Sequence, residues 1–413
     1  MQMQDQQANR VRRRRVFYIP GYDPIHPRRY RELYRKEGAE QAQISGYEIA
    51  LAPKKSGSGP YGWHVRSVQD GTEAEADIEV LVWSDIVRAS MGKSIAATYG
   101  QLVRTAATYI VSGALFGLMR LRKGPVIAAL YPIVALSVQA LLGLGLGWGL
   151  AALLLALLPD FPLDWVLGLA VGLGVMTGAL RWFRRHDNRF FAYYLMHDYA
   201  FTARWGGANP PELEARMASF AARIEAAMAE DWDEVLIVGH SSGAHLAVSI
   251  LADLLREERI GTGPSRPALS FLSLGQVVPM VSYLPRATRL RADLAYLSTA
   301  RALFWLDVTA PGDGCAFALC DPVAVSGVAP ADQIHPLVIS AAFTQTLSPE
   351  RWKALRWRFF RLHFQYLCAF DKVGDYDYFR ITAGSLSLAS RFAGRAPSKS
   401  RITTQANRHT GIA

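Results

Sequence analysis

A serine flanked by glycines lies between an apolar segment and a helix-forming segment. Residues 235–238 have the composition of a buried strand, the pentapeptide Gly-His-Ser-Ser-Gly follows directly, and residues 244–258 favour a helix. In a strand–turn–helix of this kind the serine backbone is strained and its hydroxyl is exposed, while the flanking glycines let strand and helix approach closely. Ser241 is therefore the candidate nucleophile. Gly239 and Gly243 are the candidate structural residues of the turn.

A nucleophilic serine requires an acid and a base from other strand ends. Residues 303–309 predict a strand, and Asp313 lies in the Gly/Pro turn after it, so Asp313 is the candidate acid. The alternatives are Asp307, which lies inside that strand, and Asp321, which precedes a proline and is as well explained as a turn former. His363 follows the last predicted strand, whereas His335 precedes it and would lie at the opposite end of the sheet. His363 is therefore the candidate base, and His335 is the alternative. A purely structural histidine on an aromatic helix face is the other explanation for His363.

An oxyanion also requires fixed hydrogen-bond donors, and backbone N–H groups serve this purpose well. Residues 16–19 predict a short strand, and the turn that follows it would expose the N–H groups of Tyr22 and Asp23. The N–H of Ser242, directly after the nucleophile, is the expected second donor. Gly21 in this turn has an equally good explanation as an ordinary turn glycine.

A strand, GxSxG, a helix, and then an aspartate and a histidine in that order resemble the α/β-hydrolase superfamily, particularly its lipase and esterase branches. The likeness covers roughly residues 15–85 and 201–378. It implies an α/β fold with a mostly parallel sheet flanked by helices. It also implies that an ester or thioester acylates Ser241, that His363 carries the proton and that Asp313 orients the imidazole. An HGGG-type oxyanion motif is missing, and the segment inserted before the nucleophile is unlike the usual lid.

The inserted segment contains two long apolar stretches that predict a transmembrane hairpin. Residues 125–158 carry no charge, and these 34 residues would extend about 51 Å as a helix, against ~30 Å for the hydrocarbon core. We therefore expect one span with excess length, kinked or tilted near residues 143–148, and a second span at residues 161–180. Basic residues before the first span and after the second predict that both ends are cytoplasmic.

Small residues recur at four-residue spacing in both spans. Gly143 and Gly147 in the first span, with Gly168/Gly172 and Gly174/Gly178 in the second, predict close helix packing. A further uncharged stretch, residues 105–119, is predicted to be an interfacial or short re-entrant helix. A third crossing would place Gly21 and Ser241 on opposite sides of the membrane, and no active site could then assemble from them.

The remaining organisation follows from composition. Residues 1–14 and 395–413 are polar and predicted to be disordered, residues 15–100 and 186–394 are the two parts of the hydrolase domain, and residues 101–185 are the membrane insertion. Three early strands, at residues 47–53, 63–68 and 78–83, predict a partly antiparallel edge of the sheet. An amphipathic helix at residues 212–230 is expected to cross over to the nucleophile strand.

Charge and cysteine content limit the partners. The 413 residues are 51% apolar with a formal net charge of +10, and the basic excess at residues 10–15, at the hairpin flanks and at residues 351–361 suits an anionic inner leaflet. Cations interleaved with aromatics at residues 351–358 could also bind nucleic acid, but no nucleic-acid-binding motif accompanies them, so none is expected. Three cysteines without CxxC spacing argue against a zinc site and a disulfide framework, and no metal or cofactor is expected.

Together these patterns predict an integral membrane serine hydrolase, in a bacterial-type inner membrane, with a cytoplasmic active site. The expected substrate is a carboxylic ester or thioester, favoured to be lipid-like because apolar substrates partition into the bilayer. Two alternatives stay open. The same acyl-enzyme could transfer its acyl group to an alcohol, or the chain could be a catalytically silent scaffold that retains the hydrolase architecture.

Overall fold

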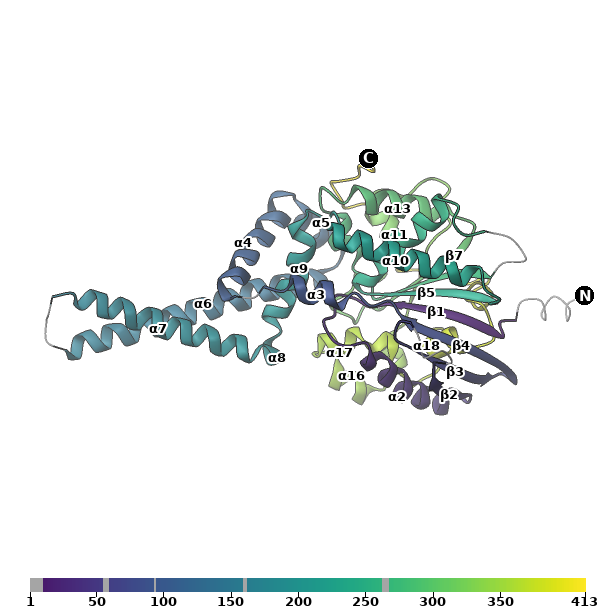
Figure 1. Cartoon of the computed structure of the whole chain (residues 1–413), viewed down its shortest axis with the longest axis horizontal. Helices are drawn as coiled ribbons and strands as arrows, with labels where there is room; N and C mark the ends of the chain where they lie inside the picture. The colour runs from purple at the N-terminus through teal and green to yellow at the C-terminus, as the bar shows by residue number, and fades with distance from the viewer. Residues whose placement is uncertain (1–9, 55–58, 93, 159–161, 262–266) are drawn as a thin grey trace, which may run out of the picture.

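A twisted sheet of eight strands forms the centre of the computed structural model, which describes residues 10–54, 59–92, 94–158, 162–261 and 267–413 (Figure 1). The strand order is β2-β3-β4-β1-β5-β6-β7-β8. The strands are β1 Arg13–Ile19, β2 Glu48–Pro53, β3 Gly62–Gln69, β4 Thr72–Val80, β5 Glu234–His240, β6 Ala268–Leu274, β7 Leu303–Thr309 and β8 Leu337–Ser340. The six strands from β4 to β8 in this order run parallel, and β3 is antiparallel to β2 and β4. The predicted mostly parallel sheet is confirmed.

The antiparallel edge of the sheet was predicted correctly, but the predicted start of its third strand was not. β4 begins at Thr72, six residues before the predicted start at 78, because residues 72–77 alternate acidic with smaller side chains and have little hydropathy signal. Cross-strand partners stabilise this acidic segment: His64 Nδ1 on β3 lies 2.7 Å from Asp77 Oδ1 on β4. The sequence of β4 alone does not reveal which residues of β3 pair with it.

Helices cover both faces of the sheet (Figure 1). Side chains of β1 alternate between the two layers, with Phe17 and Ile19 packed on one core and Val16 and Tyr18 on the other. The first core is closed by α3 Ser84–Ser90, α10 Pro211–Met228, α11 Ser242–Arg256, α12 Val278–Ser282, α13 Thr288–Thr299 and α14 Pro322–Val325. The second is closed by α2 Arg28–Ser45, α15 Phe343–Thr346, α16 Pro349–Leu355, α17 Phe359–His363, η1 Gln365–Leu367, α18 Tyr378–Ala383 and α19 Leu388–Arg391.

The N-terminal basic run is ordered from Arg10 onward, in contrast to the predicted disorder of residues 1–14; residues 1–9 lie outside the described residues. Arg14 lies in β1 with a fully buried side chain, and its Nε donates to Glu234 Oε2 at 2.5 Å. Arg15 pairs with Glu79. These cations are neutralised by protein carboxylates, as buried charges require, and do not form a free basic patch.

The C-terminal tail is also packed, although it has no regular helix or strand and was predicted to be disordered. Ile402 forms an isolated bridge with Cys320, and the buried Asn407 donates hydrogen bonds to the carbonyl groups of Ser282 and Ser326. The tail therefore closes one side of the domain. Its polar residues serve as hydrogen-bond partners for loops that lack strand neighbours.

Two helices project away from the sheet as a hairpin, α6 Lys123–Leu157 and α7 Asp164–Arg185 (Figure 1). Both are long and apolar enough to cross a membrane, and most of each remains unburied. The predicted pair of spans is confirmed at this level. α6 is a single continuous helix of 35 residues through the region where a kink was expected. Residues 159–161, which join the spans, lie outside the described residues.

Glycines determine how closely the two hairpin helices approach. A Cβ on Gly147 would lie 2.4 Å from the carbonyl oxygen of Gly172, and one on Gly168 would lie 2.8 Å from Leu155 Cδ1. The predicted close packing is thus present between Gly147 and Gly172, whereas Gly143 faces Met176 and Gly168 faces Leu155. Gly174 and Gly178 have nothing within 4 Å of such a Cβ, so the third predicted pair does not lie in the interface.

Replacing Gly147 with leucine is expected to separate α6 from α7, because the side chain would collide with the Gly172 backbone. Overpacking of this kind costs about 1–3 kcal/mol of the free energy of unfolding. SDS titration of the detergent-solubilised protein, followed by circular dichroism, measures the change. Gly145→Leu is the matched control, since a Cβ there meets nothing within 4 Å. Equal stability of the two variants would contradict the glycine-packed interface.

The stretch at residues 105–119 forms parts of two helices, α4 Ile95–Val111 and α5 Ala114–Leu121, which meet at a bend of 75°. Gly113 stands at the bend with φ of 76°, a conformation that favours glycine. By length and composition alone the bent pair could be one broken span. However, Leu118 of α5 is buried, and the Tyr109 hydroxyl donates to the Met280 carbonyl oxygen at 2.9 Å. These contacts with the sheet domain favour the predicted re-entrant or interfacial helix.

Candidate active site

Ser241 stands alone between β5 and α11, with φ of 57° and ψ of −122°. A non-glycine residue with positive φ is strained, and the surrounding backbone must hold it there. The glycines provide the necessary space. A Cβ on Gly239 would lie 2.7 Å from Ala244 Cα, and one on Gly243 would lie 2.1 Å from the Ile19 carbonyl oxygen. The predicted sharp turn and the roles of both glycines agree with this geometry.

Asp313 and His363 form a hydrogen-bonded pair near the carboxyl end of the parallel strands. His363, the last residue of α17, has its Nδ1 2.7 Å from Asp313 Oδ2. The same oxygen accepts from the Tyr366 hydroxyl at 3.0 Å, and Oδ1 accepts from the Cys315 N–H at 2.8 Å. Burial alone would raise the pKa of Asp313, but His363 and these donors outweigh it and hold the pKa below its ordinary value. Asp313 is thus a carboxylate that fixes the imidazole with Nδ1 protonated.

His240, the residue before the candidate nucleophile, contacts the candidate base His363. Its Nε2 lies 3.0 Å from the His363 carbonyl oxygen, so it must donate there, and its Nδ1 lies 3.2 Å from the Tyr18 hydroxyl. The two imidazole rings stack with centroids 5.0 Å apart. Burial lowers the pKa of His240 to about 3, so it stays neutral and positions His363 without carrying charge.

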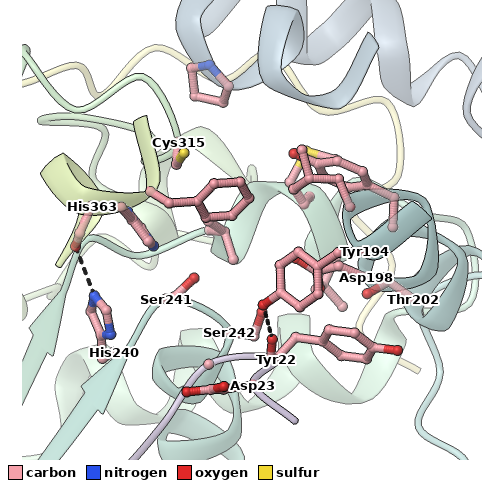
Figure 2. A pocket seen from close by; sticks show the side chains of 18 of the residues that line it. Tyr22, Asp23, Tyr194, Asp198, Thr202, His240, Ser241, Ser242, Cys315 and His363 are labelled. Carbon is pink, nitrogen blue, oxygen red and sulfur yellow. Dashed lines mark hydrogen bonds between the residues drawn. The ribbon is translucent and has the colours of Figure 1, made fainter. Parts of the chain in front are cut away.

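The candidate nucleophile and the candidate base line one cavity of ≈ 80 Å³ (Figure 2). Ser241 and His363 both line it, and Figure 2 shows both side chains pointing into it. Asp313 lies behind His363 and holds it. The structure therefore brings together the nucleophile, base and acid that the sequence predicted from segments up to 122 residues apart, the separation of Ser241 from His363.

The three predicted oxyanion residues line the same cavity. A Cβ on Gly21 would lie 2.9 Å from Ser241 Cβ, so the turn after β1 lies directly against the nucleophile. Within the described part of the chain, no acceptor is hydrogen-bonded to the N–H groups of Tyr22, Asp23 or Ser242. Ser242 also begins α11, whose N-terminus favours negative charge. These groups are available for a negatively charged oxygen.

The alternative candidates lie elsewhere. His335 precedes β8 at the amino end of the sheet, where its N–H donates to the Ser298 carbonyl oxygen and its ring contacts Phe304. Asp307 is inside β7, and burial raises its pKa to about 8 beside Ser273. Asp321 caps α14 by accepting from the N–H groups of Val323 and Ala324. None of the three lines the cavity.

One group of side chains near the cavity has potential metal ligands: Asp313, Cys315 and His363. The 2.7 Å separation of His363 Nδ1 and Asp313 Oδ2 is a hydrogen-bond distance, and Tyr366 also donates to that oxygen. Burial raises the pKa of the Cys315 thiol, which opposes the thiolate form that metals bind. The donor set fits a hydrogen-bonded acid–base pair better than a metal site.

Sequence patterns did not identify the residues that the first hairpin helix and the helices flanking the hairpin contribute to the cavity. α9 Ala192–Arg204, which follows α8 Asp187–Phe190, supplies Tyr194 and Asp198, while α4 supplies Tyr109 and α6 supplies Pro125. The available signal in the sequence for this part of the cavity was the carboxylate of Asp198, within the largely apolar segment that forms α9. The helices that flank the hairpin, together with the start of α6, thus form one wall of the cavity that holds Ser241.

The basic aromatic segment at residues 351–361 was predicted to suit an anionic membrane surface, and the structure places part of it elsewhere. Arg351 forms ion pairs with Glu37, Glu40 and Asp371, at 3.5, 2.9 and 2.9 Å. Phe360 lines the cavity. Part of this segment therefore belongs to the fold and to the site, and is not a free basic surface.

Comparison of the chain with protein-family models, with curated proteins and with solved structures finds no match. Since a fold alone does not define an activity, the function has to be argued from the chemistry of this cavity.

Proposed function

We propose that this protein is a membrane-anchored serine hydrolase of the α/β-hydrolase type that cleaves a carboxylic ester or thioester. The observation that carries the proposal is the arrangement of Ser241, in a strained turn, in one cavity with a histidine held by a buried carboxylate. A strained backbone is costly, about 1–3 kcal/mol, and such residues cluster at active sites. A catalytic role for Ser241 would account for that cost.

The chemistry follows from the three side chains. Ser241 Oγ attacks the acyl carbon, and Nε2 of His363 accepts the hydroxyl proton. The carbon–oxygen or carbon–sulfur bond to the leaving group breaks as His363 returns that proton to it. Water then attacks the acyl-enzyme by the same route, releasing the acid and restoring the serine. Asp313 keeps the proton on Nδ1 and stabilises the imidazolium, and the N–H groups of Tyr22, Asp23 and Ser242 are the proposed oxyanion donors.

A lipid-like acyl group is supported by the space beside the cavity. A groove of ≈ 610 Å³ adjoins it and shares the lining residues Asp23, Tyr194, Phe360 and Phe364. Apolar side chains, including Phe191 at the start of α9, line much of this groove near the base of the hairpin. The ≈ 80 Å³ cavity is too small for a long acyl chain, so we place that chain in the groove.

The proposed setting is a bacterial-type inner membrane with the sheet domain on the cytoplasmic side. The hairpin is bounded by Arg120 and Arg122 before α6, by Lys123 at the start of α6, and by Arg184 and Arg185 at the end of α7. Basic flanks favour the cytoplasmic side of a membrane. Because α4, α6 and α9 all reach the cavity, a substrate leaving the bilayer would meet Ser241 within a short distance.

Labelling with a fluorophosphonate probe, combined with hydrolysis of short p-nitrophenyl esters, tests the proposal. The wild-type protein in detergent is expected to label and to hydrolyse the ester, and Ser241→Ala is expected to do neither. Ser219→Ala, a change at an exposed serine of α10, is the matched control and should label like the wild type.

A folded wild-type protein that neither labels nor cleaves esters would overturn the proposal in favour of a silent scaffold. Labelling accompanied by acyl transfer to an added alcohol, without hydrolysis, would instead identify an acyltransferase, because the same acyl-enzyme serves both reactions.

A further inference from the structure

Asp198 lines the wall of the cavity opposite His363, as Figure 2 shows. It belongs to α9, the helix that connects the hairpin with the sheet domain. Within the described residues, no side chain or backbone N–H donates a hydrogen bond to its carboxyl group. Burial raises the pKa of this carboxyl to about 7, although His363 acts in the opposite direction. A carboxyl group with a pKa raised by burial, without donors and facing a cavity, is a candidate for ligand binding.

The wall around Asp198 is made of tyrosines whose hydroxyl groups are already used. The Tyr109 hydroxyl donates to the Met280 carbonyl oxygen, that of Tyr194 donates to the Tyr22 carbonyl oxygen, and that of Tyr22 lies 2.6 Å from Ser90 Oγ. Because these hydroxyl groups already have partners, we assign to the rings the contact with a ligand in the cavity. Ring faces attract cations through their quadrupole.

The charge balance of the cavity is opposite to that of the whole chain. The formal net charge of the protein is +10, yet none of the described residues that line the cavity is a lysine or an arginine. Its lining carries Asp23 and Asp198, with Asp313 directly behind His363. Arg29, the neighbouring cation, lies 3.2 Å from Asp23 and compensates that carboxylate. Among the described residues that line the cavity, Asp198 has no such cation, so in its ionised form it favours a positive ligand.

We propose that Asp198, together with the ring faces of Tyr22, Tyr109, Tyr194 and Tyr199, forms a subsite for a methylated ammonium group of the substrate. The ligand class is an ester whose alcohol part carries a quaternary ammonium close to the scissile bond. This proposal rests on the proposed hydrolase function of the same cavity. The head group would occupy the ≈ 80 Å³ cavity, and the acyl chain would occupy the adjoining groove.

A matched pair of substrates tests the subsite. The choline ester and the 3,3-dimethylbutyl ester of one short acid have the same shape, and only the first is charged. For the wild type we expect kcat/KM to be at least about tenfold higher for the choline ester, as a cation on aromatic rings beside a carboxylate implies. In Asp198→Asn this ratio should fall close to one. Asp231→Asn, which removes a fully exposed carboxylate, is the control and should keep the wild-type ratio.

The ratio should also depend on pH, because only the ionised carboxyl attracts the cation. Above a pH of about 7 Asp198 is ionised and the choline ester is favoured, and below it the preference should decline. The other titratable groups facing Asp198 are His363, Cys315 and the four tyrosines. Burial raises the pKa of Cys315 and of the four tyrosines further from neutrality. The decline should be absent in Asp198→Asn, which separates this carboxyl from the other groups.

A binding measurement separates failure of the subsite from failure of the hydrolase function. Tetramethylammonium chloride should raise the Tm of the wild type and of Ser241→Ala above that in equal sodium chloride, and should not raise that of Asp198→Asn. If both esters are cleaved at equal rates, the subsite is overturned while the hydrolase stands. If neither ester is cleaved, the Tm shift decides: its presence supports the subsite and its absence overturns it.

Discussion

Replacing His363 with alanine is expected to lower kcat/KM for a short acyl ester by about 10⁴- to 10⁶-fold, nearly as much as replacing Ser241. The reason is geometric. His363 lines the same cavity as Ser241, is held by Asp313 at 2.7 Å and is stacked on His240, so it is the group that we propose takes the serine proton. Members of such a triad act as a unit, and the second loss adds little to the first. Steady-state kinetics of the two single variants and the double variant measure this directly.

Two further variants make the assignment specific. Asp313→Asn keeps the shape of the site but cannot hold Nδ1–H as a charged acceptor, so a smaller though still large loss is expected. His335→Gln is the control, since His335 lies at the amino end of β8 and outside the cavity, and its kcat/KM should change less than about twofold. If His335→Gln abolished hydrolysis while His363→Ala retained it, the base would have been assigned wrongly.

The nucleophile turn could be predicted because its signal is local. Strand, turn and helix are consecutive, and the glycines are required by contacts of a few residues, such as Gly239 with Ala244. The positions of Asp313 and His363 could be predicted because parallel strands place their carboxyl ends at one edge. Each argument used order along the chain and did not need side-chain packing.

The supporting residues of the site could not be predicted in this way. His240 has a role only because a carbonyl group 123 positions later lies 3.0 Å from its ring. Tyr366 and Asp198 likewise depend on which helix folds over the cavity. Hydropathy identified the hairpin, but it could not indicate that α9, after the hairpin, returns to cover Ser241.

Charge patterns were the least informative. The runs at residues 10–15 and 351–361 resemble membrane-binding patches in the sequence, yet Arg14, Arg15 and Arg351 are paired with carboxylates from distant segments. A sequence shows the sign of a charge and not its partner. Burial and pairing are tertiary properties, and they decide whether an arginine is available to a membrane.

The buried pair of Arg14 and Glu234 leads to the largest expected effect on stability. Arg14→Met should lower the free energy of unfolding by about 3–5 kcal/mol, because it leaves Glu234 charged and fully buried without its cation. The carbonyl groups of Gly384 and Leu386 would lose their donors as well. Urea unfolding of the detergent-solubilised protein, followed by tryptophan fluorescence, gives the difference.

Arg13 provides the matched control for this measurement, since it is the preceding residue of the same strand. Its partner, Asp231, is fully exposed, and an exposed pair contributes about 0–1 kcal/mol. Arg13→Met should therefore be close to the wild type, whereas Arg14→Met should not. Adding Glu234→Gln to Arg14→Met should recover part of the loss, because a neutral amide is less costly to bury than a lone carboxylate. If Arg13→Met and Arg14→Met were equally stable, the buried ion pair would add nothing to stability, and β1 would be held by its apolar residues alone.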